Sequence, residues 1–102
     1  MTDTRLGPTG RSFGTALEHI KAGGRARRAG WNGKGMWIAY GAGREVSHTA
    51  LWNPQTKKFA LSVGGVVEVL PYILFKTADD KILMGFLASQ TDMLSEDWEL
   101  LD

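Results

Sequence analysis

The sequence predicts an α+β fold, in which an N-terminal helix packs on an antiparallel β-sheet. An apolar stripe at helical spacing is confined to the start of the chain, at Phe13, Ala16, Leu17 and Ile20. Further along, runs of β-branched and aromatic residues are separated by short turns, as in hairpins. The chain has 102 residues, which is the usual length of one domain with one core.

The N-terminal part is predicted to contain a leader and a helix. Residues 1–11 are expected to be a flexible leader, because glycine and proline interrupt any regular structure there. Ser12 is an expected N-cap and Gly23-Gly24 follow the apolar stripe, so a helix is predicted over residues 13–22. Residues 12–102 are then expected to form a single domain.

A glycine-rich stretch, Gly30 to Trp37, predicts the first hairpin. Residues 25–29 are expected to form the strand before it, and residues 36–40 the return strand. Asn32-Gly33 lies between them and favours a tight turn, because both residues tolerate positive φ. The hairpin therefore carries tryptophans close to its turn.

The second half of the chain predicts the remaining strands and a short C-terminal helical turn. Strands are expected at residues 66–69, 72–77, 82–87 and 98–101. A helical turn is predicted at residues 90–94, with Ser89 as its N-cap and Asp92 in the capping-box position. Residues 41–65 are a long connection that is expected to hold a small element or a functional loop, with a turn at Asn53 to Thr56.

The net charge of +1 hides an uneven distribution of charge. Residues 1–44 carry eight Lys or Arg against two acidic residues, whereas residues 45–102 carry four lysines against nine acidic residues. The basic half suits either phosphate groups or the acidic half of a neighbouring subunit. The chain has no cysteines, which excludes disulfides and thiolate sites and fits a reducing cytosol.

The sequence shows no set of catalytic or metal-binding residues. His19 and His48 are the only histidines, and neither has metal-ligand spacing with nearby carboxylates. Asp79-Asp80 is typical of a solvated turn, and no serine lies in a nucleophile elbow. We therefore expect a protein that is not an enzyme, with no metal site and no cofactor.

Binding residues are better indicated, although each has a structural alternative. Trp37 and Trp98 lie in strand-like runs and are expected in the core, whereas Trp31 lies beside a turn and favours a surface or interface role. Stacking a base on such a ring contributes roughly 1–3 kcal/mol. Asn32 serves either the turn or a ligand, and Lys34 is either solvated or meets a phosphate.

Two polar groups are further candidates. The arginines before the turn either pair bidentately with phosphates or form a solvated strand face: Arg25, Arg27 and Arg28. For Ser89 and Asp92, helix capping and ligand binding explain the residue types equally well. Gln90 and Thr91 have no capping role to explain them.

Two signature stretches identify a resemblance. The first is Arg28-Ala29-Gly30-Trp31-Asn32-Gly33-Lys34-Gly35-Met36, preceded by Phe13 and Ala16-Leu17. The second is Leu87-Ala88-Ser89-Gln90-Thr91-Asp92-Met93-Leu94-Ser95-Glu96-Asp97-Trp98, preceded by Pro71-Tyr72-Ile73 and Lys76-Thr77-Ala78-Asp79. Over residues 12–101 the chain resembles the second Thoeris anti-defence family of phages and prophages, first catalogued as a domain of unknown function.

The resemblance implies a protein that sequesters a signal. Such proteins bind the cyclic ADP-ribose variants made by bacterial TIR-domain proteins, such as glycocyclic ADP-ribose, and hold them intact. Some members also bind cyclic di- or trinucleotides of the CBASS defence at separate pockets. They assemble as homotetramers with ligand held between subunits. The expected place of action is the cytoplasm of the infected bacterial host.

The resemblance also implies which residues bind the ligand. By position they are Trp31, Asn32, Ser89, Gln90, Thr91 and Asp92, followed by Arg28, Lys34 and Met36. The chain departs from the family at Phe86, where a tryptophan is usual, and in residues 42–66, which vary among relatives and here contain Trp52. The alternatives are a nucleic-acid-binding protein and a structural or interaction module of a phage particle.

Overall fold

A computed structural model describes residues 7–31 and 35–102 of the chain. The described residues form two compact units. Unit 1 contains the chain up to Gly41 and from Tyr72 onward, and unit 2 is Ala42–Pro71. The turn predicted at Asn32-Gly33, and the first part of the predicted leader, lie outside the described residues.

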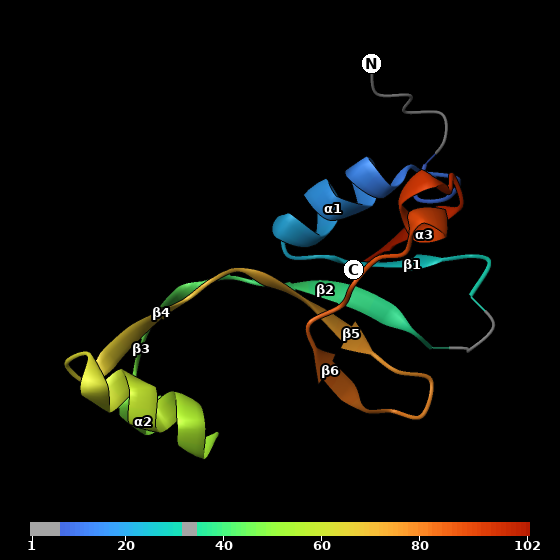
Figure 1. Ribbon diagram of the computed structural model, residues 1–102. Helices are drawn as coiled ribbons and strands as arrows, with labels where there is room; N and C mark the ends of the chain where they lie inside the picture. The colour runs from blue at the N-terminus through green and yellow to red at the C-terminus, as the bar shows by residue number, and fades with distance from the viewer. Residues whose placement is uncertain (1–6, 32–34) are drawn as a thin grey trace. The chain divides into compact units, whose positions relative to one another are not determined.

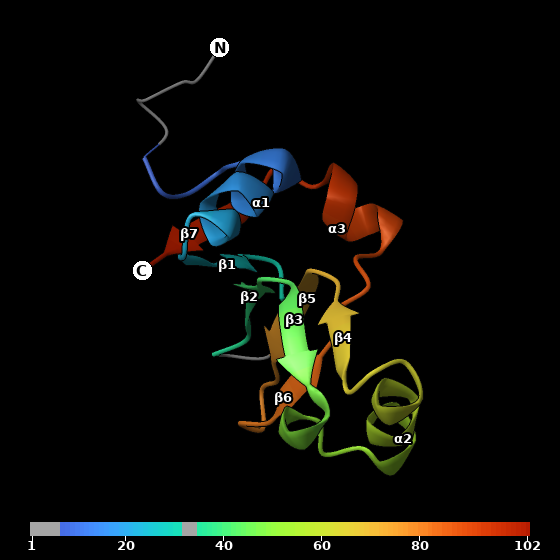
Figure 2. The same ribbon diagram turned by 90° about the vertical axis from the view of Figure 1, so that its left-hand side faces the viewer.

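Unit 1 is an antiparallel sheet with helices on one face. Among the described residues, five strands form this sheet in the order β6-β5-β2-β1-β7. They are β1 (Arg25–Arg28), β2 (Trp37–Gly41), β5 (Tyr72–Lys76), β6 (Ile82–Met84) and β7 (Trp98–Leu101). The helices α1 (Phe13–Lys21) and α3 (Gln90–Leu94) lie side by side on one face (Figures 1 and 2). The predicted α+β class, with its N-terminal helix, C-terminal helical turn and final strand, is confirmed.

Local chemistry sets the ends of α1. The hydroxyl of Ser12 accepts the backbone N–H of Thr15 at 3.2 Å, which confirms the predicted N-cap. Gly23 adopts a φ of 105° just past the C-terminus, a conformation that favours glycine. Residues 7–11, the described part of the predicted leader, contact β7: the Pro8 carbonyl accepts the N–H of Leu100 at 2.7 Å.

The core of unit 1 lies between α1 and the sheet. Its fully buried members are Ala16, Ile20, Ala26, Ile38 and Trp98. Ala26 pairs with Ile38 across β1 and β2, so both side chains point to the same face. Phe13 of α1 packs on Trp98 with ring centroids 5.3 Å apart, and the prediction that Trp98 lies in the core is confirmed.

The prediction that Trp37 belongs to the core is wrong. Trp37 precedes the buried Ile38 on β2, and neighbouring residues of a strand point to opposite faces. Trp37 is therefore on the other face of the sheet, where it is half-buried and the Arg25 guanidinium carbon lies 5.3 Å from its ring centroid. Such a cation–π contact contributes about 0.5–1 kcal/mol at an exposed site.

Unit 2 is a hairpin joined through a helix. The strands β3 (Arg44–Ser47) and β4 (Val66–Val69) pair antiparallel, and η2 (His48–Ala50) and α2 (Pro54–Ser62) form their connection. The turn predicted at Asn53 to Thr56 is instead the start of α2. Asn53 Oδ1 accepts the N–H of Gln55 at 2.9 Å, and Pro54 occupies the first helical position, where proline is favoured.

Large apolar side chains are exposed in both units. In unit 1 they lie on the edge strand β6, in the segment that leads into α3 and in α3 itself: Ile82, Leu83, Met84, Leu87, Met93 and Leu94. In unit 2 they are Trp52, Phe59, Leu61, Val63, Val66 and Leu70. Among the helices of the described part, none is long and apolar enough to cross a membrane.

Candidate functional site

A pocket of about 350 Å³ opens in unit 1 at the end of β1. Its lining residues are Arg27, Arg28, Ala29, Trp31, Gly35, Met36 and Glu99. The strands β1 and β7 supply the charged side chains, and the connection from β1 to β2 supplies the rest. The volume is within the range of small-molecule sites. The structure therefore brings Trp31, Arg28 and Met36, all predicted from the sequence, to one cavity.

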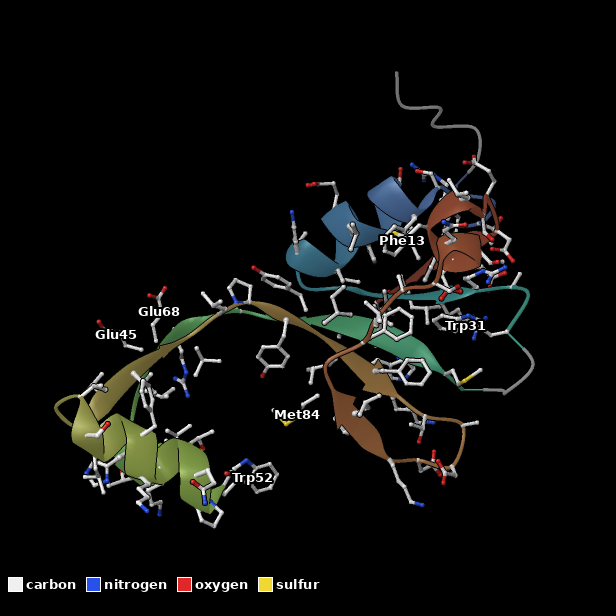
Figure 3. The ribbon with its side chains drawn as sticks, viewed as in Figure 1. Phe13, Trp31, Glu45, Trp52, Glu68 and Met84 are labelled. Atoms are coloured by element: carbon white, nitrogen blue, oxygen red, sulfur yellow. The ribbon has the colours of Figure 1, made fainter. Side chains whose placement is uncertain are left out.

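Trp31 forms the aromatic wall of this pocket, and neighbouring aromatic rings and a hydrogen bond hold its side chain in place. Its ring packs edge-on against Phe75, Phe86 and Trp98, with centroid distances of 5.6, 6.0 and 5.3 Å. Edge-to-face pairs contribute about 0.5–1.5 kcal/mol each beyond their burial. The indole N–H also donates to Asp92 Oδ1 at 3.4 Å. Trp31 is thus a partly buried wall at the edge of an aromatic cluster (Figure 3).

Arg28 is the centre of an ion-pair network beside Trp31. Its Nη1 donates to Asp92 Oδ1 at 2.8 Å, and its Nε and Nη2 donate to the two Asp97 oxygens at 3.0 and 3.4 Å. The Arg28 side chain is 14% exposed. The hydrogen bonds to Asp97 and then to Asp92 raise the pKa of Arg28, so its charge is permanent.

Both carboxylates of the network are held in the charged form. The hydrogen bond from Arg28 lowers the pKa of Asp97, and the backbone N–H of Gly30, which donates at 2.9 Å, lowers it further. At Asp92 burial raises the pKa, but hydrogen bonds from the Ser89 backbone and from Arg28 outweigh burial and lower it. The network therefore stays ionised at neutral pH.

The segment Ser89 to Asp92 begins α3 and reaches the network through Asp92. Ser89 Oγ accepts the Asp92 N–H at 3.0 Å, and Asp92 Oδ2 accepts the Ser89 N–H at 3.0 Å, which confirms the predicted capping box. Gln90 and Thr91 are exposed on α3 and take no part in this capping box. Ligand binding by these four residues stays a prediction.

In unit 1, acidic side chains from the second half of the chain pair with two arginines of β1, Arg27 and Arg28. Arg27 lies opposite Glu99 in the register of β1 and β7, and its Nε donates to Glu99 Oε1 at 2.8 Å. Arg25 donates from Nε to the Asp102 carbonyl at 2.8 Å. The three arginines that the sequence offered to a phosphate thus have partners in their own chain. The other two predicted ligand residues, Asn32 and Lys34, lie outside the described residues.

Asp97 and Glu99 were missed as members of this site. A signal for them exists, because the strands predicted at residues 25–29 and 98–101 have opposite charge. Sequence spacing does not say which strands are neighbours. The opposite charges of the two strands therefore could not be assigned to particular residue pairs. Among residues 7–31 and 35–102, no three His, Cys, Asp or Glu side chains gather as metal ligands.

Comparison with known proteins matches almost the whole chain. A family model described as the Thoeris anti-defense 2-like domain matches residues 11–101. A curated protein of Bacillus phage SP01 named Thoeris anti-defense 2 is 40% identical over 93 residues, an alignment that covers 88% of this chain and 93% of the phage protein. The family match spans both units and includes every residue that lines the pocket.

Proposed function

The chain belongs to the Thoeris anti-defense 2-like family, and we propose that it binds a cyclic ADP-ribose-type signalling nucleotide and holds it intact. The family and the named phage relative support an anti-defence role against Thoeris. The ligand we favour is glycocyclic ADP-ribose, made by a bacterial TIR-domain protein. The proposed place of action is the cytoplasm of the infected host.

The observation that carries this proposal is the chemistry of the pocket wall. Trp31 lines the cavity and its ring is fixed by three aromatic neighbours, so it offers a preorganised indole for a base to stack on. A guanidinium has five N–H groups, and Asp92 and Asp97 accept three from Arg28, so the other two can meet a phosphate. A nucleotide with a base, a ribose and a pyrophosphate matches this combination.

Binding without chemistry is the second part of the proposal. Glu99 lines the pocket, but it is paired with Arg27 and is therefore not placed as a free general base. Arg28 and Trp31 are held before any ligand arrives, and preorganised groups give tight binding because less freedom is lost on association. These features suit storage of a ligand better than its turnover.

We also propose that the chain works as a homotetramer with the ligand between subunits. The large apolar side chains exposed on β6 and in the segment before α3 support self-association, because an interface between subunits would remove them from water. The expected result of analytical ultracentrifugation is a species of four times the chain mass. A monomer at micromolar concentration would contradict this part of the proposal.

Calorimetry with purified glycocyclic ADP-ribose tests the central proposal, followed by chromatography of the ligand released from the denatured protein. We expect binding at submicromolar concentration and recovery of unchanged ligand. Trp31→Ala should weaken binding by roughly 10- to 100-fold, in line with the loss of one stacked base. Trp52→Ala is the matched control, since Trp52 is exposed in unit 2. Absence of heat, or recovery of a cleaved product, would reject the proposal.

Titration of cyclic di- and trinucleotides in the same calorimeter tests whether the chain also takes ligands of the CBASS defence. The nucleic-acid alternative predicts affinity for single-stranded DNA that falls steeply with salt. Because the net charge is only +1 and residues 45–102 carry nine acidic residues, we expect no such binding at physiological salt. The phage-particle alternative predicts that the protein co-purifies with virions and carries no nucleotide.

A further inference from the structure

We propose that Asp97 is a positioning residue of the pocket. It fixes the Arg28 side chain and the backbone that follows, and thereby sets the orientation in which Trp31 meets a ligand. This inference rests on the proposed function, because it concerns the same pocket. Asp97 itself is absent from the pocket lining, so its effect is exerted through other residues.

Asp97 holds three consecutive residues at the end of β1. Its carboxylate accepts Nε and Nη2 of Arg28 and the backbone N–H of Gly30, and its carbonyl accepts the N–H of Ala29 at 3.0 Å. The Asp97 side chain is 34% exposed, so this is not the behaviour of a core residue. Asp97 thus holds residues 28–30, which directly precede Trp31 in the pocket wall.

Gly30 is the residue that lets this carboxylate approach. A Cβ added at Gly30 would lie 2.9 Å from Asp97 Oδ2 and 3.4 Å from Arg28 Nη2. Real Cβ atoms essentially never come within 3 Å of another atom in this way, so any larger residue must push the carboxylate away. Gly30 is not among the described glycines with positive φ, so the contact and not the backbone conformation calls for glycine.

Two sets of hydrogen bonds connect Trp31 to the residues that Asp97 holds. The Trp31 backbone N–H donates to the Arg28 carbonyl at 3.2 Å. The Trp31 indole donates to Asp92, whose carboxylate also accepts Arg28 Nη1. Without the Asp97 charge, Asp92 is the one carboxylate that still pairs with Arg28, and an amide at position 97 has a single acceptor oxygen where the carboxylate has two. Both connections to Trp31 are then held less firmly. Supporting carboxylates of this kind act on binding although they do not touch the ligand.

The first test needs no ligand. The indole N–H resonances in a ¹H–¹⁵N spectrum are assigned with Trp31→Phe, and Asp97→Asn is compared with Glu96→Gln, which removes a neighbouring exposed charge. We expect the Trp31 resonance to shift or broaden in Asp97→Asn and Gly30→Ala and to stay in place in Glu96→Gln. An unmoved Trp31 resonance in both pocket variants would overturn the inference, whether or not the wild type binds the nucleotide.

The second test measures affinity for glycocyclic ADP-ribose in the same variants, at a temperature where each is folded by circular dichroism. We expect Asp97→Asn and Gly30→Ala to bind roughly tenfold more weakly or worse, by analogy with metal sites, where loss of a group that orients a ligating residue typically costs 10- to 100-fold. Glu96→Gln should bind like the wild type. The double variant should bind no more weakly than the weaker single variant, because both changes break the same contact. Wild-type affinity in a folded Asp97→Asn would contradict the inference, and if that variant is unfolded, Gly30→Ala decides.

Discussion

The guanidinium of Arg28 and the carboxylate of Asp92 lie 2.8 Å apart, although 64 residues separate them in the chain. Their side chains are 14% and 13% exposed. This ion pair joins the end of β1 to the first turn of α3, and Asp97 completes it from the residue before β7. The pocket wall and the capping box of α3 are therefore parts of one network.

Replacement of Arg28 tests how much this network contributes to the free energy of unfolding. Arg28→Ala leaves Asp92 and Asp97 without their cation, and we expect the free energy of unfolding to fall by about 2–3 kcal/mol, less than the ~3–5 kcal/mol typical of fully buried pairs. Arg27→Ala breaks a more exposed pair and should lower it by less than about 1 kcal/mol. Urea unfolding measures both, and equal losses would contradict the role given to Arg28.

Acid should weaken the fold through the same carboxylates. The pKa values of Asp92 and Asp97 are lower in the folded chain than in the unfolded chain, so the unfolded chain binds protons first as the pH falls. The stability they provide is complete above about pH 5 and is lost as the pH falls below about 4. Urea midpoints recorded from pH 7 to pH 3 should show this decline, and Asp97→Asn should make it shallower. A decline that begins at pH 6 would point to other groups.

Substitutions at the start of α3 can distinguish helix capping from ligand binding. Ser89→Ala removes the N-cap, and we expect a loss of roughly 0.5–2 kcal/mol in the free energy of unfolding. Thr91→Ala and Gln90→Ala change exposed side chains outside the capping box and should stay within about 0.5 kcal/mol. If Thr91→Ala or Gln90→Ala nevertheless weakens nucleotide binding, that residue contacts the ligand. Normal binding by both would remove them from the predicted set.

Two acidic residues oppose each other in unit 2. Glu45 of β3 and Glu68 of β4 are register partners, both are exposed, and both lie on the same side of the hairpin (Figure 3). Like charges opposite each other destabilise a strand pair, so Glu68→Lys should stabilise the hairpin by roughly 0.5–1 kcal/mol. Hydrogen exchange at the Val46 and Val67 amides is the measurement, and Glu68→Gln should give about half the effect. Faster exchange in Glu68→Lys would show that repulsion between Glu45 and Glu68 does not destabilise the hairpin.

The chain order of elements could be predicted from the sequence in unit 1 better than in unit 2. Helix α1, the capping box and the strands of unit 1 are marked by residues a few positions apart, so the patterns that form them are visible locally. In unit 2, the sequence predicts neither strand β3 nor a helix beyond the turn at Asn53 to Thr56, because the apolar pattern of α2 is weak. The chemistry of Asn53-Pro54 fits a helix start as well as a turn.

The sequence by itself determined the fold class and the helix caps, and it marked the signature stretches around Trp31 and Asp92. Each of these features depends on residues that are close together in the chain. The tertiary structure decided which side chains meet. The alternation of side chains along a strand shows which residues share a face, but it does not show which face is buried. Packing therefore decides that Ile38 and not Trp37 faces the core. The register of β1 with β7 brings Arg28 to Asp97, a residue that no local pattern connects with the pocket.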